Sequence, residues 1–177
     1  MSAPRKPSPV TAGVDLGGTK IQTVVLRKGK VAGTTRVLTP QTGVPAEVVE
    51  AIVGTIRASL DVAGSSVSEL AGVGIGTPGE IDTEAGAVLL AANVPGFSER
   101  VELGSLVSQG LEGTTVTVGN DVSVGVLGEH KRGAGRPFRN LHDSRHGRAG
   151  FGHNAGAPLR CSGVTRRSIA TGERRRA

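Results

Sequence analysis

The order of the predicted strands constrains the fold of this chain more than any other feature. Three consecutive segments are rich in β-branched residues, and we expect strands at Ala12–Asp15, Ile21–Arg27 and Val31–Leu38. The connections between them, Leu16–Thr19 and Lys28–Lys30, are short, contain glycine and are typical of tight turns. The three strands are therefore predicted to form an antiparallel meander.

Helices and buried strands follow the meander. Pro45-Ala46-Glu47 opens a predicted helix, with proline near its first turn. Six apolar residues then recur at helical spacing: Val48, Val49, Ile52, Val53, Ile56 and Leu60. Leu70–Ile75 and Thr115–Val118 are typical of buried parallel strands, and Val122–Lys131 is a further predicted helix. This order predicts an α/β fold with a mixed sheet, and it is similar to the ribonuclease-H-like half of an actin-like ATPase domain.

The core of such a fold has to be aliphatic, because the 177 residues include 28 Gly, three Phe and no Trp or Tyr. The single cysteine, Cys161, excludes an intrachain disulfide. No apolar run reaches the roughly 18 residues that span a membrane, and residues 1–9 are not followed by the apolar stretch of a signal peptide. We expect a cytoplasmic protein with no membrane partner.

The net charge of +6 is confined to the end of the chain. Residues 1–141 carry 13 basic and 13 acidic side chains, whereas residues 142–177 carry eight Arg and two acidic residues. The last segment has few large apolar side chains, so burial cannot offset the entropy lost on ordering. It is predicted to be disordered. A nucleic-acid-binding tail is the alternative interpretation, although helical periodicity and interleaved aromatics are missing.

The first candidate site is the turn Asp15-Leu16-Gly17-Gly18-Thr19-Lys20. Two glycines let backbone N–H groups approach an anion, while Thr19 adds a hydroxyl and Lys20 a positive charge. Asp15 is suited to hold Mg²⁺ through water. The motif is neither a Walker motif nor a dinucleotide fingerprint. The plain alternative is a hairpin with a solvated aspartate.

The second candidate site is Gly119-Asn120-Asp121, at the carboxyl end of a predicted strand, where open α/β sheets bind ligands. Asp121 could accept a proton from a substrate hydroxyl, and Asn120 could bond sugar hydroxyls. The alternative is an Asx cap for the following helix. The loop Gly76–Gly79 is equally ambiguous by itself, since it could be a simple β-turn.

Four segments together resemble the ROK family (repressors, open reading frames and sugar kinases). They are Gly13–Lys20, Gly72–Gly79, Ala92–Phe97 and Val118–Asp121, and they occur in the family's order and spacing. The resemblance covers residues 12–141. It implies an actin-like ATPase fold and glucokinase-like transfer of the γ-phosphoryl group of ATP to a hexose or amino sugar.

The resemblance also implies roles for single residues. Asp121 would be the catalytic base, and Asn120 and Gly79 would bind the sugar. The side facing ATP and Mg²⁺ would be formed by Asp15, Gly17, Gly18, Thr19 and Lys20, with Asp15 holding the metal through water. The family's repressors carry a DNA-binding domain ahead of this motif. Only about 11 residues precede it here, which favours the kinase branch and no specific nucleic-acid partner.

The resemblance stops after Leu141. Family members continue with a second glycine-rich phosphate strand, a Glu-x-Gly-His sugar contact, a zinc site and a second lobe. Cys161 alone cannot make a zinc site, so none is expected. We therefore divide the chain into a disordered N-terminus (1–11), an incomplete actin-like domain of ROK type (12–141) and an Arg-rich, non-homologous segment (142–177).

Residues 142–177 have a second interpretation, as the product of a shifted reading frame. Codons for His142–Arg148 can be chosen so that a one-base advance reads Thr-Thr-Leu-Gly-Thr-Gly-Val, which is the type of phosphate strand the family has here. The next shifted codon cannot encode the expected glycine.

Three functional hypotheses follow. The first is an ATP-dependent sugar kinase by ancestry, truncated and inactive, for which a family-like homo-oligomer is doubtful. The second is a non-enzymatic sugar- or nucleotide-binding or regulatory protein. The third is a nucleic-acid binder acting through the basic segment.

Overall fold

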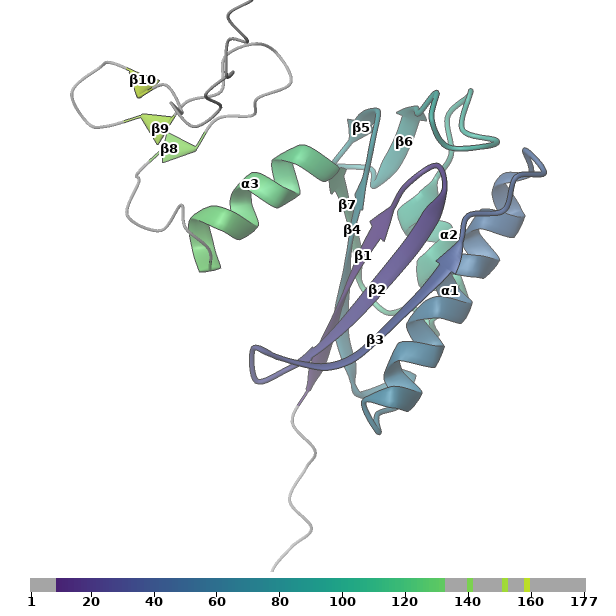
Figure 1. Ribbon diagram of the computed structural model, residues 1–177. Helices are drawn as coiled ribbons and strands as arrows, with labels where there is room; N and C mark the ends of the chain where they lie inside the picture. Colours follow the sequence, from purple (N-terminus) through teal and green to yellow (C-terminus); the bar gives the residue numbers. More distant parts are fainter. Residues whose placement is uncertain (1–8, 133–139, 142–150, 153–157, 160–177) are drawn as a thin grey trace, which may run out of the picture. The chain divides into compact units, whose positions relative to one another are not determined.

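The computed structural model describes residues 9–132, 140–141, 151–152 and 158–159 (Figure 1). The chain divides into two compact units, residues 1–128 and residues 129–177. The first unit contains the main sheet, and the predicted strands and helices lie in it except for the last residues of the predicted helix Val122–Lys131. The expected disorder of residues 1–11 falls mostly outside the described residues, although β1 already begins at Val10.

A five-stranded mixed sheet forms the centre of the first unit, in the order β3-β2-β1-β4-β7. Its strands are β1 (Val10–Leu16), β2 (Lys20–Arg27), β3 (Lys30–Leu38), β4 (Leu70–Thr77) and β7 (Val116–Asn120). β1, β2 and β3 pair antiparallel, whereas β4 pairs parallel with both β1 and β7. The meander and the parallel type of the later strands are thereby confirmed, and the mixed α/β sheet with them.

Two helices, α1 (Pro45–Val62) and α2 (Leu103–Gly110), lie on one face of this sheet (Figure 1). The predicted helical stripe is the buried side of α1, where Val48, Ile52, Ile56 and Leu60 are almost fully covered. Gly33 lets β3 approach α1 closely, because a Cβ there would lie 2.2 Å from the carbonyl oxygen of Ser59. The core is aliphatic as expected, except for the fully buried ring of Phe97.

Part of the opposite face of the sheet, on β1, β4 and β7, has small side chains. β1 alternates buried and exposed residues, so that Gly13 and Asp15 lie on the side away from the buried Val14. Gly74 continues this glycine-rich surface on β4, and Thr117 continues it on β7. This face leaves an open floor beside α3 (Asp121–Arg132), the helix that begins where β7 ends.

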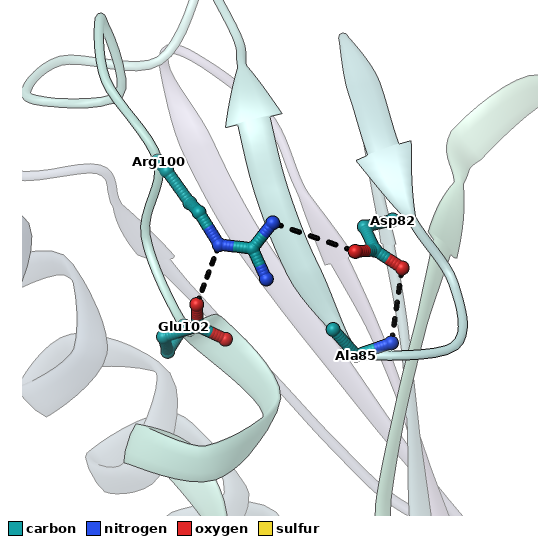
Figure 2. Close-up of polar contacts among 4 residues, drawn as sticks. All are labelled: Asp82, Ala85, Arg100 and Glu102. Atoms are coloured by element: carbon teal, nitrogen blue, oxygen red, sulfur yellow. Dashed lines mark hydrogen bonds and ion pairs between the residues drawn. The ribbon is translucent and has the colours of Figure 1, made fainter.

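A two-stranded hairpin, β5 (Glu80–Asp82) and β6 (Ala87–Leu90), leaves the end of β4 and was not predicted as strands. Figure 2 shows the polar contacts that fasten it. The guanidinium of Arg100 bridges the carboxylates of Asp82 (3.4 Å) and Glu102 (2.6 Å). The backbone N–H of Ala85 also donates to Asp82, at 3.0 Å. The hairpin turn is therefore tied to the segment that leads into α2.

The second unit contains three two-residue strands, β8 (Asn140–Leu141), β9 (Phe151–Gly152) and β10 (Pro158–Leu159). They pair antiparallel in the order β10-β9-β8. Apart from β9 and β10, the predictions for residues 142–177 fall outside the described residues. Among the helices that the structure describes, none combines the length and apolar character needed to cross a bilayer.

Candidate functional site

Asp15 and Asp121 line the same cleft, although they come from different ends of the domain sequence. The cleft has a volume of about 760 Å³ and lies between the small-residue face of the sheet and the start of α3. Asp15 is exposed and Asp121 is half-buried. Two carboxylates facing one cleft at the carboxyl ends of parallel strands form an arrangement suited to ligand binding.

The pairing of β1, β4 and β7 brings the two aspartates to this common edge. Asp15 on β1 is paired with Gly76 on β4, which is paired with Gly119 on β7. A Cβ on Gly76 would lie 3.5 Å from the Cα of Asp121. The first turn of α3 therefore lies directly beside β4, where an added methyl group on Gly76 would make an ordinary van der Waals contact with it.

Asn120 connects the start of α3 to the loop after β4. Its Oδ1 accepts hydrogen bonds from the backbone N–H groups of Val122 (3.1 Å) and Ser123 (3.4 Å), which is N-cap geometry. Its Nδ2 donates to the carbonyl oxygen of Gly79 at 3.1 Å. The capping alternative is thus confirmed for Asn120. One N–H of the amide has no bond among the contacts of the described residues and could still donate to a ligand.

Gly79 adopts φ +106°, and a Cβ there would lie 2.2 Å from the carbonyl oxygen of Leu90. Both the conformation and the close approach require glycine. A smaller cavity of about 420 Å³ adjoins this corner. It is lined by Asn120 and Ser123 and shares Gly119 with the larger cleft. The structure therefore brings the two predicted sugar-binding residues together.

The predicted phosphate turn, Gly17–Lys20, lies at the end of β1 and does not line either cavity. Its hairpin is closed by a hydrogen bond from the Gly17 N–H to the Lys20 carbonyl at 2.9 Å. Thr19 and Lys20 are exposed. Gly18 packs against the backbone of Asn93, because a Cβ on Gly18 would lie 1.8 Å from the Asn93 carbonyl oxygen. The turn and the Ala92–Phe97 segment of the sequence motif are neighbours.

A divalent cation fits the chemistry of this edge. Mg²⁺ retains most of its waters and uses one or two carboxylates together with substrate phosphates. Asp15 offers an exposed carboxylate at the cleft, next to the turn that follows it. Among the residues that the structure describes, no group of three or more His, Cys, Asp or Glu side chains is placed so that it could hold a metal ion.

Sequence reasoning missed the floor of the cleft and the residues behind the turn. Gly13, Gly74 and Gly76 line the cleft, and the alternation of glycine in Gly72–Gly76 could have indicated it, since residues two apart share a face. Thr39 and Gln41 donate hydrogen bonds to the turn. No sequence signal marks these two residues.

Known proteins match this chain over the region that carries the site. The ROK family pattern matches residues 11–143. Glucokinase from Streptomyces coelicolor is 34% identical over 134 residues, which cover 75% of this chain and 39% of that protein. Glucokinase from Streptomyces lividans matches to the same extent. The chain thus spans 39% of the length of these relatives.

Solved structures of ROK family kinases also match this chain. A ROK family glucokinase from Streptomyces griseus, in complex with glucose and AMPPNP, is 32% identical with a TM-score of 0.64. The match covers 75% of this chain and 39% of that one. An inorganic polyphosphate/ATP-glucomannokinase from Arthrobacter sp. strain KM is also 32% identical, with a TM-score of 0.60 over 72% of this chain and 50% of that one. The chain has the actin-like ATPase fold, of which it covers the N-terminal portion. It belongs to the ROK family.

Proposed function

We propose that this chain carries the sugar-binding and phosphate-binding side of an ATP-dependent hexose or amino-sugar kinase. The observation that carries the proposal is the placement of Asp15 and Asp121 in one cleft, beside the Asn120–Gly79 contact. Support comes also from the relatives, which are named as glucokinases. ATP would supply the γ-phosphoryl group, and Mg²⁺ would neutralise charge on its phosphates.

Asp121 has the position of a general base in this proposal. Its Oδ1 accepts a hydrogen bond from the N–H of Val122 at 2.8 Å, which orients the carboxylate at the helix start. It would take the proton of the attacking sugar hydroxyl as the oxygen bonds to phosphorus. Asn120 would donate its second amide N–H to the sugar, while Gly18 and Thr19 would direct backbone N–H groups at the phosphates.

For the 177-residue chain itself we propose ligand binding without turnover. Phosphoryl transfer needs charge neutralisation and positioning around the whole transferred group, and closure that excludes water. The residues discussed above supply the base, a metal-binding carboxylate and one phosphate turn. A non-enzymatic binding protein is the second candidate, and the same Asn120–Gly79 corner would serve it.

Calorimetric titration of the chain with glucose, mannose, N-acetylglucosamine and Mg²⁺–ATP tests the binding proposal. Coupled detection of ADP in the same mixtures tests turnover. Binding of a sugar and of ATP without ADP release is the expected result. Absence of both binding events would contradict the proposed function, and sugar-dependent ADP release would contradict the expected inactivity. Binding to DNA with steep salt dependence would instead favour the basic segment as the functional part.

A further inference from the structure

The carbonyl groups of the phosphate turn are held from behind by the residues that follow β3. The Thr39 hydroxyl donates to the carbonyl oxygen of Gly17 at 2.6 Å, and the Gln41 amide donates to that of Gly18 at 2.9 Å. The backbone N–H of Thr39 donates to the carbonyl oxygen of Thr19 at 3.1 Å. Three successive carbonyl groups of the turn are thus bonded to one short segment.

Holding these carbonyls determines where the neighbouring N–H groups point. A peptide group is planar and trans, so its C=O and N–H point in opposite directions. The carbonyl of Gly17 belongs to the same peptide group as the N–H of Gly18, and the carbonyl of Gly18 to that of Thr19. Within residues 9–132, the N–H groups of Gly18 and Thr19 make no hydrogen bond. They are donors directed away from Thr39 and Gln41.

Gln41 also makes a hydrogen bond within the segment that follows β3. The second N–H of its amide donates to the Thr39 carbonyl at 2.8 Å, so both hydrogens of the group are used. Thr39 is 2% exposed, whereas Gln41 is exposed. An exposed side chain with two backbone partners contributes little to core packing. Its contacts serve the geometry of the turn.

We infer that Thr39 and Gln41 are positioning residues for phosphate binding. By occupying the carbonyls of the turn, they keep the N–H groups of Gly18 and Thr19 turned toward an anion, where consecutive N–H groups form a concave binding surface. The inference rests on the proposed function, since the anion is the polyphosphate part of ATP. It adds to the proposed phosphate site two residues that would touch neither the nucleotide nor the sugar.

The test uses the 177-residue chain and inorganic pyrophosphate with Mg²⁺ as the probe. NMR spectra follow the amide signals of Gly18 and Thr19 during the titration, and calorimetry gives the dissociation constant. Thr39→Val and Gln41→Met should each weaken binding by about threefold to tenfold, the size of the net contribution of one hydrogen bond between neutral groups. Thr39→Ser retains the hydroxyl and should bind as the unaltered chain does.

Thr34→Val is the matched control. The Thr34 hydroxyl donates to the carbonyl oxygen of Thr23 at 3.0 Å, a contact of the same kind elsewhere between β2 and β3. It should leave pyrophosphate binding unchanged. The melting temperature of each variant is measured alongside binding. If Thr34→Val loses as much binding and as much thermal stability as Thr39→Val, the substitutions act through the sheet and not through the turn. That result would overturn the inference.

The remaining outcomes separate the inference from the proposed function. If the unaltered chain binds pyrophosphate and both Thr39→Val and Gln41→Met bind it equally well, the positioning role is wrong while the phosphate site stands. If the unaltered chain binds neither pyrophosphate nor Mg²⁺–ATP, the ATP part of the proposed function fails and the inference fails with it.

Discussion

The side-chain amide of Asn120 joins two loops of the candidate site by donating to the carbonyl oxygen of Gly79, 3.1 Å away. The same side chain caps α3 through Oδ1. One residue therefore has a local role at the helix start and a long-range role at the end of β4. These two roles can be separated by substitution.

Asn120→Ala removes both contacts and should lower the free energy of unfolding by about 1–3 kcal/mol, the combined size of a lost cap and a lost hydrogen bond. Asn120→Ser keeps a capping oxygen but cannot reach Gly79 with an N–H donor. We expect the serine variant to unfold between the unaltered chain and the alanine variant in thermal denaturation, because it keeps the cap and loses the bond to Gly79, yet to bind sugar as weakly as the alanine variant. Equal sugar affinity in all three proteins would show that Asn120 is a cap and nothing more.

Gly18→Ala should disturb the phosphate turn by steric clash. The new Cβ would lie 1.8 Å from the carbonyl oxygen of Asn93, so the turn or the facing loop has to move. We expect a destabilisation of about 1–3 kcal/mol, as for overpacked sites, together with weaker pyrophosphate binding. Urea denaturation and calorimetry measure the two effects.

Gly13→Ala is the control for that substitution. Gly13 lies on β1, the strand that leads into the turn, and a Cβ there would meet no atom within 4 Å. The variant should unfold within about 0.5 kcal/mol of the unaltered chain. A Gly13→Ala chain that lost as much stability as Gly18→Ala would argue against a specific contact with Asn93.

The regular elements could be predicted because their signals are local. The helical stripe from Val48 to Leu60 and the apolar strand at Leu70 mark buried faces in the sequence itself. Asp15 and Asp121 were each predicted at the end of a strand, but the cleft that both of them line comes from the parallel pairing of β1, β4 and β7 in the structure. The prediction of sugar-binding and catalytic roles stays a prediction.

Contacts between distant segments could not be predicted in the same way. The packing of Gly18 against Asn93 and the bonds from Thr39 and Gln41 to the turn depend on how three loops meet in space. Ordinary Thr and Gln residues in a connecting segment carry no periodicity that marks such a role. The hairpin β5–β6 was not predicted for a related reason. Its strands have three and four residues, which is too short for an alternating pattern of apolar and polar residues to be recognised.

The carboxyl group of Asp82 has its pKa lowered from the ordinary 3.8, chiefly by the hydrogen bond from the Ala85 N–H and also by Arg100, while desolvation opposes the shift. A lowered pKa in the folded state contributes stability above the ordinary pKa, and this contribution is lost as pH falls through the folded-state pKa. We therefore expect a small loss of stability below about pH 4. The effect is small because the ion pair with Arg100 is exposed and screened by water.

Asp82→Asn should remove this part of the pH dependence, because the amide does not titrate. Thermal denaturation between neutral and acidic pH, at low and high salt, measures the difference from the unaltered chain. Glu84→Gln, an exposed residue of the same turn, is the control and should leave the curve unchanged. An unaltered acid dependence in Asp82→Asn would mean that other carboxylates account for it.

Asp121→Asn should abolish phosphorylation in a protein that turns over. A suitable protein is a chimera in which residues 11–143 replace the matching segment of the Streptomyces griseus glucokinase. Asparagine keeps the shape of the side chain and cannot take a proton, so kcat should fall by about 10²–10⁴ while sugar binding survives. Glu50→Gln, on the exposed side of α1, is the control and should keep full activity. Near-normal kcat in Asp121→Asn would leave Asp121 a residue of the helix start without a catalytic role.

The last prediction concerns the DNA that encodes residues 142–177. Acidic and basic side chains balance before residue 142, whereas every basic side chain after it except histidine is arginine. The ROK family match ends at residue 143, close to this change. We propose that a shift of reading frame produces both observations. A genuine arginine-rich segment is the alternative.

Resequencing the locus decides between them. We expect a one-base insertion or deletion near codon 142, after which the corrected frame reads a glycine-rich strand of the Thr-Thr-Leu-Gly-Thr-Gly-Val type and continues in the pattern of the relatives. A linker also changes composition, so composition alone does not distinguish the two cases. The corrected protein should then release ADP in the presence of a sugar, since it would regain the groups that complete the site. Genomic DNA that confirms the present frame, with no glycine-rich strand in either other frame after codon 141, would end the proposal.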